Sequence, residues 1–429
     1  MAAPQERLTA PVDADADRAL GLAIVATYGF YLLGSLYVVA PVLAWVLVVR
    51  SLRARGPALA ELPALAWAWV AGMGLMALAL VVGHADFALG VAQTAKSLVG
   101  WAKGWALLAL FIAAGCLYGR PQTLYRAACI LGAQTLVVLP LLILGYLAGL
   151  PEVLYVSPIE VLGGPGPEFF DVSVYSVNPD NGMPRWRLFT PWAPALGLVG
   201  NVYYFLSRAE ADWRWRIAGM AGAVAMILAS GSRLGLLCIV AVETISWVAA
   251  RMSRPSTHAA LGGASLVAGL AAAPLVAAYE GFLAAFHGAR PESSRVRASL
   301  ERIALDRWSE EALLWGHGVV ERGPHLVEYM PIGSHHSWYG LLFVKGLVGL
   351  VALAVPLVLT LGVLLVRAQR SPVARVALRL CLVLVVYSFG ENLEILAYLF
   401  WPALVLIGMG LRRPESAGPA GAPPQGSPA

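Results

Sequence analysis

Residues 346–367 read GLVGLVALAVPLVLTLGVLLVR, an apolar run in which Thr360 is the only polar side chain before Arg367. A helix needs about 20 consecutive apolar residues to cross the hydrocarbon core of a bilayer, so this run is long enough to span a membrane. Similar runs recur along almost the whole chain. They are continuously apolar and do not alternate, which favours membrane helices over barrel strands. The sequence therefore predicts an all-α integral membrane protein.

The composition agrees with this fold class. Of 429 residues, 59% are hydrophobic and 13% are charged, and the mean hydropathy is +0.72. A soluble domain carries about a quarter of its residues as charged side chains, so a soluble fold is excluded. The net charge of +5 comes with arginines at the ends of apolar runs. That placement is typical of membrane topology, and it excludes a nucleic-acid-binding function.

Twelve apolar segments are expected to cross the membrane. They lie near 20–33, 36–50, 62–83, 99–118, 124–149, 190–207, 215–231, 233–250, 259–281, 346–367, 374–391 and 394–411. Residues 20–50 form either two short spans that turn at Gly34-Ser35 or one long tilted helix. Arginine-rich connections alternate with less basic ones, and the positive-inside rule places the basic set in the cytoplasm. Two spans over 20–50 give twelve helices with both termini inside.

This topology divides the chain into five parts. Residues 1–19 are expected to be a cytoplasmic tail without a signal peptide, and 20–281 to hold nine helices and an outer loop near 150–189. Residues 282–345 are expected to form a large outer segment, with an amphipathic helix over 293–308 that lies on the outer surface. Residues 346–411 hold the last three helices. The tail 412–429, rich in Pro, Gly, Ser and Ala, is expected to be disordered.

Several arginines lie on the outer side, against the positive-inside bias. Arg233, Arg295 and Arg297 have few acidic neighbours in the sequence, so we favour an anion-binding role for them. Arg302 and Arg307 are expected to pair with acidic residues of the same amphipathic helix. The stretch Ser230-Gly231-Ser232 precedes Arg233 as a tight turn that leads into a helix. Helix N-terminal amides and a guanidinium together form a suitable phosphate site.

A pair of histidines stands just before the opening run, in the stretch GSHHSWYGLLFVKG over 333–346. Imidazole is the side chain best placed to move a proton near neutral pH. His335 is therefore our candidate base and His336 its supporting neighbour. Trp338 and Tyr339 follow at once and are candidates for binding an acceptor molecule.

Two acids occupy a very short outer turn near the end of the chain, at Glu391 and Glu394. Carboxylates at a membrane face are costly unless they are paired or solvated. These two either orient His335, bind acceptor hydroxyls, or cap the turn.

Three features, in this order, resemble the O-antigen ligase and polymerase superfamily of bacterial membrane glycosyltransferases. They are Ser-Gly-Ser-Arg233 at the start of a helix, an arginine-containing outer helix ending in Gly-x-Gly, and a His-x-Ser segment followed by Gly346. Members typically begin the third motif with His-Asn. Spacing to Gly346 matches His335 to the functional histidine and His336 to the asparagine. The stretch 184–194 is similar to the family's arginine-containing entry to a central helix, and the resemblance covers roughly 185–400.

The resemblance implies a metal-independent glycosyltransferase of the C-type fold in the bacterial inner membrane, with its active site facing the periplasm. The donor would be a glycan on undecaprenyl diphosphate, the acceptor would be the lipid A–core oligosaccharide, and no cofactor is implied. Displacing a diphosphate requires charge neutralisation on the leaving group and a base on the attacking hydroxyl. The diphosphate would be bound by Arg233, Arg297, Arg295 and Arg187.

Alternative functions remain open on the sequence alone. A metal-dependent transferase needs outer carboxylates, but the only Asp-x-Asp stretch, 13–17, lies in the expected cytoplasmic tail. An O-antigen or exopolysaccharide polymerase would use the same donor with another lipid-linked glycan as acceptor. A polysaccharide-lipid transporter or flippase would place its charges in mid-membrane and often show internal repeats. The charges here lie at the outer end of the spans, which disfavours a transporter, and the motif set favours the ligase over the polymerase.

Overall fold

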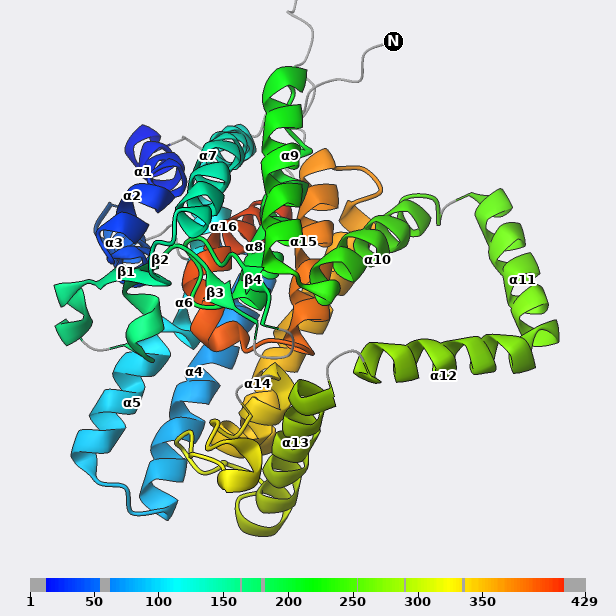
Figure 1. Cartoon of the computed structure of the whole chain (residues 1–429). Helices are drawn as coiled ribbons and strands as arrows, with labels where there is room; N and C mark the ends of the chain where they lie inside the picture. The colour runs from blue at the N-terminus through cyan, green and yellow to red at the C-terminus, as the bar shows by residue number, and fades with distance from the viewer. Residues whose placement is uncertain are drawn as a thin grey trace, which may run out of the picture.

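The computed structural model describes residues 13–54, 62–162, 164–178, 182–252, 254–288, 291–333 and 336–412. These residues are mostly helical, as expected from the sequence (Figure 1). The helices are α1 (Ala14–Val25), α2 (Thr27–Leu32), α3 (Leu36–Ala54), α4 (Ala64–Asp86), α5 (Val91–Lys103), α6 (Trp105–Leu117), α7 (Pro121–Leu147), α8 (Ala193–Ser207), α9 (Trp213–Ser230), α10 (Arg233–Ala249), α11 (Pro255–Leu270), α12 (Ala272–Gly288), α13 (Pro291–Glu311), α14 (Ser337–Arg367), α15 (Pro372–Ser388) and α16 (Leu393–Leu411).

The loop between α7 and α8 holds the only named strands among the described residues. Strand β1 (Val153–Val156) pairs antiparallel with β2 (Asp171–Ser173), and β3 (Ser176–Val177) pairs antiparallel with β4 (Pro184–Arg185). Short 3-10 helices occur at η2 (Pro158–Leu162), η3 (Pro167–Phe169) and η4 (His325–Val327).

The expectation of twelve spans is wrong for the described residues. Six helical stretches are long and apolar enough to cross a membrane, and a seventh is added if α11 and α12, bent by 81°, count as one span. Several of the expected spans form helices of fewer than 18 residues. Helix α8 has 15 residues, and α10 and α15 have 17 each. At about 1.5 Å per residue, 17 residues reach about 25 Å, less than the roughly 30 Å hydrocarbon core.

The N-terminal region consists of separate helices that meet at a turn. Gly34, at φ +64°, lies between α2 and α3, so the turn expected at Gly34-Ser35 is present, although only α3 of this region is long and apolar enough to cross a membrane. Helix α1 begins at Ala14, inside the stretch 1–19 expected to be a tail. The acids there make structural contacts. Asp13 caps α1 and pairs with Arg50 at 2.9 Å, and Asp17 accepts the Arg120 N–H at 2.7 Å. The tail expected over 412–429 lies outside the described residues, except for Arg412.

Helix α16 lies at the centre of the molecule (Figure 1), and its side chains are buried along almost its whole length. Its closest partner is α6. A Cβ at Gly115 would lie 2.0 Å from the Val405 carbonyl oxygen, and one at Gly408 would lie 2.1 Å from the Ile112 carbonyl oxygen. These glycines therefore let the two backbones touch. The four cysteines are free, and Cys129, Cys238 and Cys381 are buried.

Helix α13 confirms the expected helix over 293–308, but its apolar face is covered by protein. Val296, Leu300 and Ala304 pack against Val327 of η4 and Phe343 of α14. The apolar face therefore packs on protein, and the position of the helix on the outer membrane surface stays a prediction. Helices α11 and α12 instead project away from the other helices (Figure 1), and most of their described side chains are exposed.

Connections expected on the same membrane face contact one another at several points. On the arginine-rich side, Asp17 contacts Arg120, and Gln369 donates a hydrogen bond to the Ala249 carbonyl at 2.6 Å. On the other side, connections distant in sequence also meet, through His84 with Gly318 and through Ser337 with Glu391. The arginines singled out for an anion site belong to the second group of connections.

Candidate active site

The candidate site lies where the starts of α8, α10 and α14 meet the turn between α15 and α16. These helices gather in the middle of the molecule (Figure 1). A Cβ at Gly390 would lie 2.7 Å from Leu234, which is next to Arg233. A Cβ at Gly197 of α8 would lie 2.8 Å from the Ser232 Cβ and 3.0 Å from the Tyr387 hydroxyl. Three of these segments are thus in direct contact, and the start of α14 joins them through the hydrogen bond from Ser337 to the Glu391 carbonyl.

The turn between α9 and α10 is built by its small residues. Gly231 ends α9 at φ +59°, in the left-handed region that glycine adopts without strain. The Ser232 Oγ then accepts the Gly235 N–H at 3.1 Å and caps α10. Arg233 is the first residue of α10 and is half-buried. The expected turn is therefore present, with a guanidinium beside the helix N-terminus.

His336 is the N-cap of α14. Its Nδ1 accepts the Tyr339 N–H at 3.4 Å, and its ring lies on the Tyr339 ring with centroids 4.2 Å apart. Burial lowers the pKa of His336 to about 4. The imidazole is therefore neutral near pH 7, and with Nδ1 accepting, Nε2 carries the proton. His335 lies outside the described residues.

Glu391 is a buried carboxylate in the turn between α15 and α16, with 4% of its surface exposed. Its Oε2 accepts a hydrogen bond from the Trp192 indole N–H at 3.0 Å. Its carbonyl oxygen accepts one from the Ser337 hydroxyl at 2.7 Å, which ties this turn to the start of α14. Burial raises the pKa of Glu391 to about 7, and the positive charge of Arg297 and the Trp192 hydrogen bond act in the opposite direction.

The two candidate arginines on α13 differ in their surroundings. Arg297 is half-buried, and its charge acts on Glu391. Arg295, two residues earlier on the helix, is exposed. Of the two, Arg297 is therefore the residue whose charge reaches the site. Arg307 pairs with Glu311 at 2.8 Å, as expected for an ion pair within the helix.

Arg187 is buried and forms an ion pair with Asp171 at 2.6 Å. It also donates a hydrogen bond to the Pro191 carbonyl at 2.8 Å. These contacts hold the loop that ends at Trp192, the N-cap of α8. In this structure Arg187 therefore supports the residue that binds Glu391. Its binding to a diphosphate stays a prediction.

The remaining candidates take different positions. Glu394 lies on the first turn of α16, with Oε1 4.0 Å from the Lys345 Nζ. The Trp338 indole donates to the Ser388 hydroxyl at 2.9 Å, and Tyr339 packs on His336. Trp338 and Tyr339 therefore flank the site. Glu394 lies about one helical turn after Glu391, and its described partner is Lys345.

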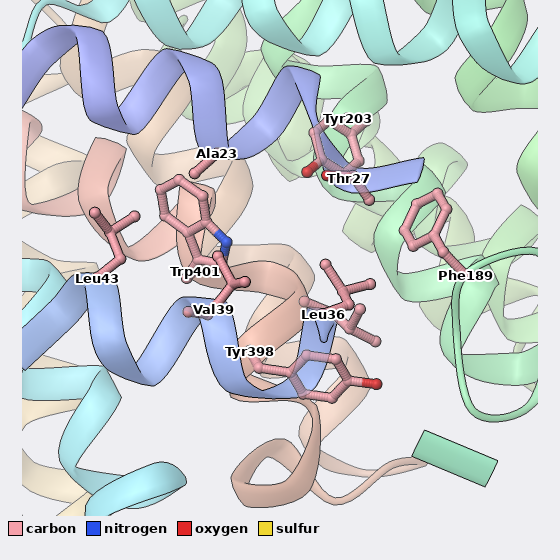
Figure 2. A pocket seen from close by; sticks show the side chains of 11 residues that line it. Ala23, Thr27, Leu36, Val39, Leu43, Phe189, Tyr203, Tyr398 and Trp401 are labelled. Atoms are coloured by element: carbon pink, nitrogen blue, oxygen red, sulfur yellow. The ribbon is translucent and has the colours of Figure 1, made fainter. Parts of the chain in front are cut away.

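Sequence reasoning did not assign roles to Trp192 and Ser337, the two residues that hold Glu391. Trp192 is 199 residues from Glu391 and Ser337 is 54 residues from it, so no local pattern reports these contacts. A small cavity elsewhere is lined by Thr27, Phe189, Tyr203 and Tyr398 (Figure 2). Its volume of about 10 Å³ holds one water at most, so it is not a substrate pocket.

The described residues contain no group of three or more His, Cys, Asp or Glu side chains placed to hold a metal ion. No protein-family model matches this chain, and no curated protein matches it.

Proposed function

We propose that this chain is an O-antigen ligase, which transfers a glycan from undecaprenyl diphosphate to the lipid A–core oligosaccharide at the periplasmic face of the bacterial inner membrane. The observation that carries the proposal is that Ser337 at the start of α14 binds the turn of Glu391, a buried carboxylate on which the charge of Arg297 acts. Arg297 and the start of α14 belong to two of the motifs that resemble the family. The site thus combines a cation that can act on the leaving group with a carboxylate that can accept the hydroxyl proton.

The leaving group is a diphosphate, whose negative charge grows as the bond to the sugar breaks. Arg297 and Arg233 supply positive charge, and the first amides of α10 supply donors beside Arg233. Guanidinium forks bind phosphate oxygens bidentately, which fixes the diphosphate as well as neutralising it. This set stabilises the departing charge without a metal ion.

His336 contributes a hydrogen-bond donor. Its Nδ1 is engaged with the Tyr339 N–H, so the N–H at Nε2 is the group that remains for a substrate oxygen. Because burial keeps the ring neutral, this donor is present throughout the physiological pH range. We assign His336 to orienting the substrate and to capping α14.

Electrophoresis of lipopolysaccharide from a strain that lacks this chain tests the proposed function. Loss of a ligase should leave an intact core without polymer, together with accumulated lipid-linked polymer. A core that carries one repeat unit would instead identify a polymerase. Normal lipopolysaccharide would contradict both transferase functions. Expression of the wild-type chain should restore the polymer-bearing bands, and expression of the Arg297→Ala variant should not.

His336→Asn and His336→Ala should differ in stability. Asparagine also caps helices well, so the Asn variant should unfold near the wild-type temperature. The Ala variant loses the cap and should be destabilised by about 1 kcal/mol. Thermal unfolding in detergent, followed by intrinsic fluorescence, measures the difference. If the two variants unfolded at the same temperature, capping by His336 would not contribute to stability.

A further inference from the structure

Transfer of a sugar to a hydroxyl needs a group that takes the hydroxyl proton. Among the described side chains of the candidate site, an imidazole and a carboxylate are the candidates for accepting this proton, at His336 and Glu391. His336 is a weak base at neutral pH, because burial lowers its pKa to about 4 and one ring nitrogen is already used within the protein. Of the two, Glu391 is therefore the better proton acceptor near neutral pH.

The contacts of Glu391 leave one of its carboxylate oxygens for a substrate. Oε2 accepts the Trp192 N–H, whereas no described residue donates a hydrogen bond to Oε1. The main chain of the same residue is fixed on both sides, because its N–H donates to the Tyr387 carbonyl at 2.8 Å and its carbonyl accepts from Ser337. A carboxylate that is buried, held in place and half-engaged is arranged to act on something that is not part of the protein.

We propose that the Glu391 carboxylate accepts the proton of the acceptor hydroxyl; this inference rests on the proposed transferase function. The hydroxyl O–H bond breaks and its proton goes to Glu391. The hydroxyl oxygen forms the new bond to the anomeric carbon of the donor. The bond from that carbon to the diphosphate oxygen breaks, and its electron pair leaves with the diphosphate. Protonated Glu391 returns its proton to water after the product departs.

The charges around Glu391 suit this role. Arg297 of α13 favours the carboxylate, and the Trp192 indole at the start of α8 donates to it. Tyr387 of α15 and neutral His336 at the start of α14 bring no positive charge. From α10, the apolar side chain of Leu234, next to Arg233, packs at Gly390. The resulting pKa, about 7, is near the operating pH, where a general base is most effective. A diphosphate on Arg297 would weaken the pull of that cation and strengthen the base.

Rates of single-turnover transfer, measured from pH 5.5 to 8.5 with the full chain in nanodiscs, test the inference. Below pH 7 the wild-type rate should rise about tenfold per pH unit, because only the ionised carboxylate accepts a proton, and it should be level above pH 7. Glu391→Gln keeps the size of the side chain and an oxygen for Trp192. It should lose about 10²–10⁴-fold in rate, and its residual rate should not change between pH 6 and 8.

The controls separate this inference from the proposed function. Glu310→Gln removes an exposed carboxylate of α13 and should keep the wild-type rate and pH profile. His335→Ala should keep the rise below pH 7 even if it is slower. A wild-type protein that transfers no glycan contradicts the proposed function, and this inference with it. A Glu391→Gln variant that transfers at the wild-type rate, or a pH profile lost in His335→Ala and kept in Glu391→Gln, overturns this inference alone. Binding of undecaprenyl diphosphate to Glu391→Gln confirms that the variant is folded.

Discussion

Replacing Arg297 with alanine should lower the transfer rate by about 10²–10³-fold, which is typical for removal of one group that stabilises developing charge. The guanidinium is half-buried and acts on Glu391, so no bulk solvent substitutes fully for it. Arg297→Lys should recover only part of the rate, because an ammonium lacks the bidentate fork. Arg233→Ala should lose rate by a similar factor. Kinetics of the purified variants with the lipid-linked donor measure both effects.

Arg297→Ala should also change the pH profile. Removing the cation that favours ionised Glu391 raises the pKa of that carboxyl, so the rise in rate should move to higher pH. Arg302→Ala is the matched control, since Arg302 lies on the same helix and is exposed. Wild-type transfer by both Arg297→Ala and Arg233→Ala would remove the diphosphate site. An inactive Arg295→Ala variant together with an active Arg297→Ala variant would place the functional arginine two residues earlier.

The fold class follows from the sequence because apolar runs form helices, but the number of spans does not. Hydropathy reports that a helix avoids water and does not report whether lipid or protein surrounds it. Helix α8 shows the difference. It is apolar and only 15 residues long, and nearly all of its side chains are buried among other helices. A sequence window assigns it to the membrane, whereas in the structure its apolar side chains are covered by protein.

The candidate site was predictable in its parts and not in its assembly. Ser230-Gly231-Ser232 specifies a turn and a cap from local chemistry alone, so Arg233 could be placed at a helix start. The role of Glu391 could not be assigned, because it depends on Trp192 and Arg297, which reach it through tertiary packing. In the sequence, a carboxylate in a short turn is expected to be solvated by water. Its burial among these partners, which only the structure shows, is what suggests that it acts as a base.

The Gly-x-Gly segment gains a physical reason from the structure. Helix α14 is interrupted at Gly346, where φ is +59° and ψ is −161°. The loop after α13 enters this break and replaces the missing helical hydrogen bonds. The bonds run from the N–H of His317 to Phe343 O, from Gly318 to Val344 O, from Leu347 to Leu313 O and from Val348 to Leu314 O, all between 2.9 and 3.1 Å. These hydrogen bonds hold the first part of α14, from Ser337 to Gly346, in place next to His336.

Gly346→Ala should therefore destabilise the protein by about 3 kcal/mol. A Cβ there would lie 2.3 Å from the Leu314 carbonyl oxygen, and the positive φ adds strain for any other residue. The loop has to leave the break or the helix has to straighten, and either change displaces the start of α14 and Ser337, which holds Glu391. Gly362→Ala is the matched control, because it lies in the same helix with nothing within 4 Å of its Cβ position. Fluorimetry in detergent should show a lower unfolding temperature for Gly346→Ala only. Equal unfolding temperatures for the two variants would mean that the loop does not depend on the break.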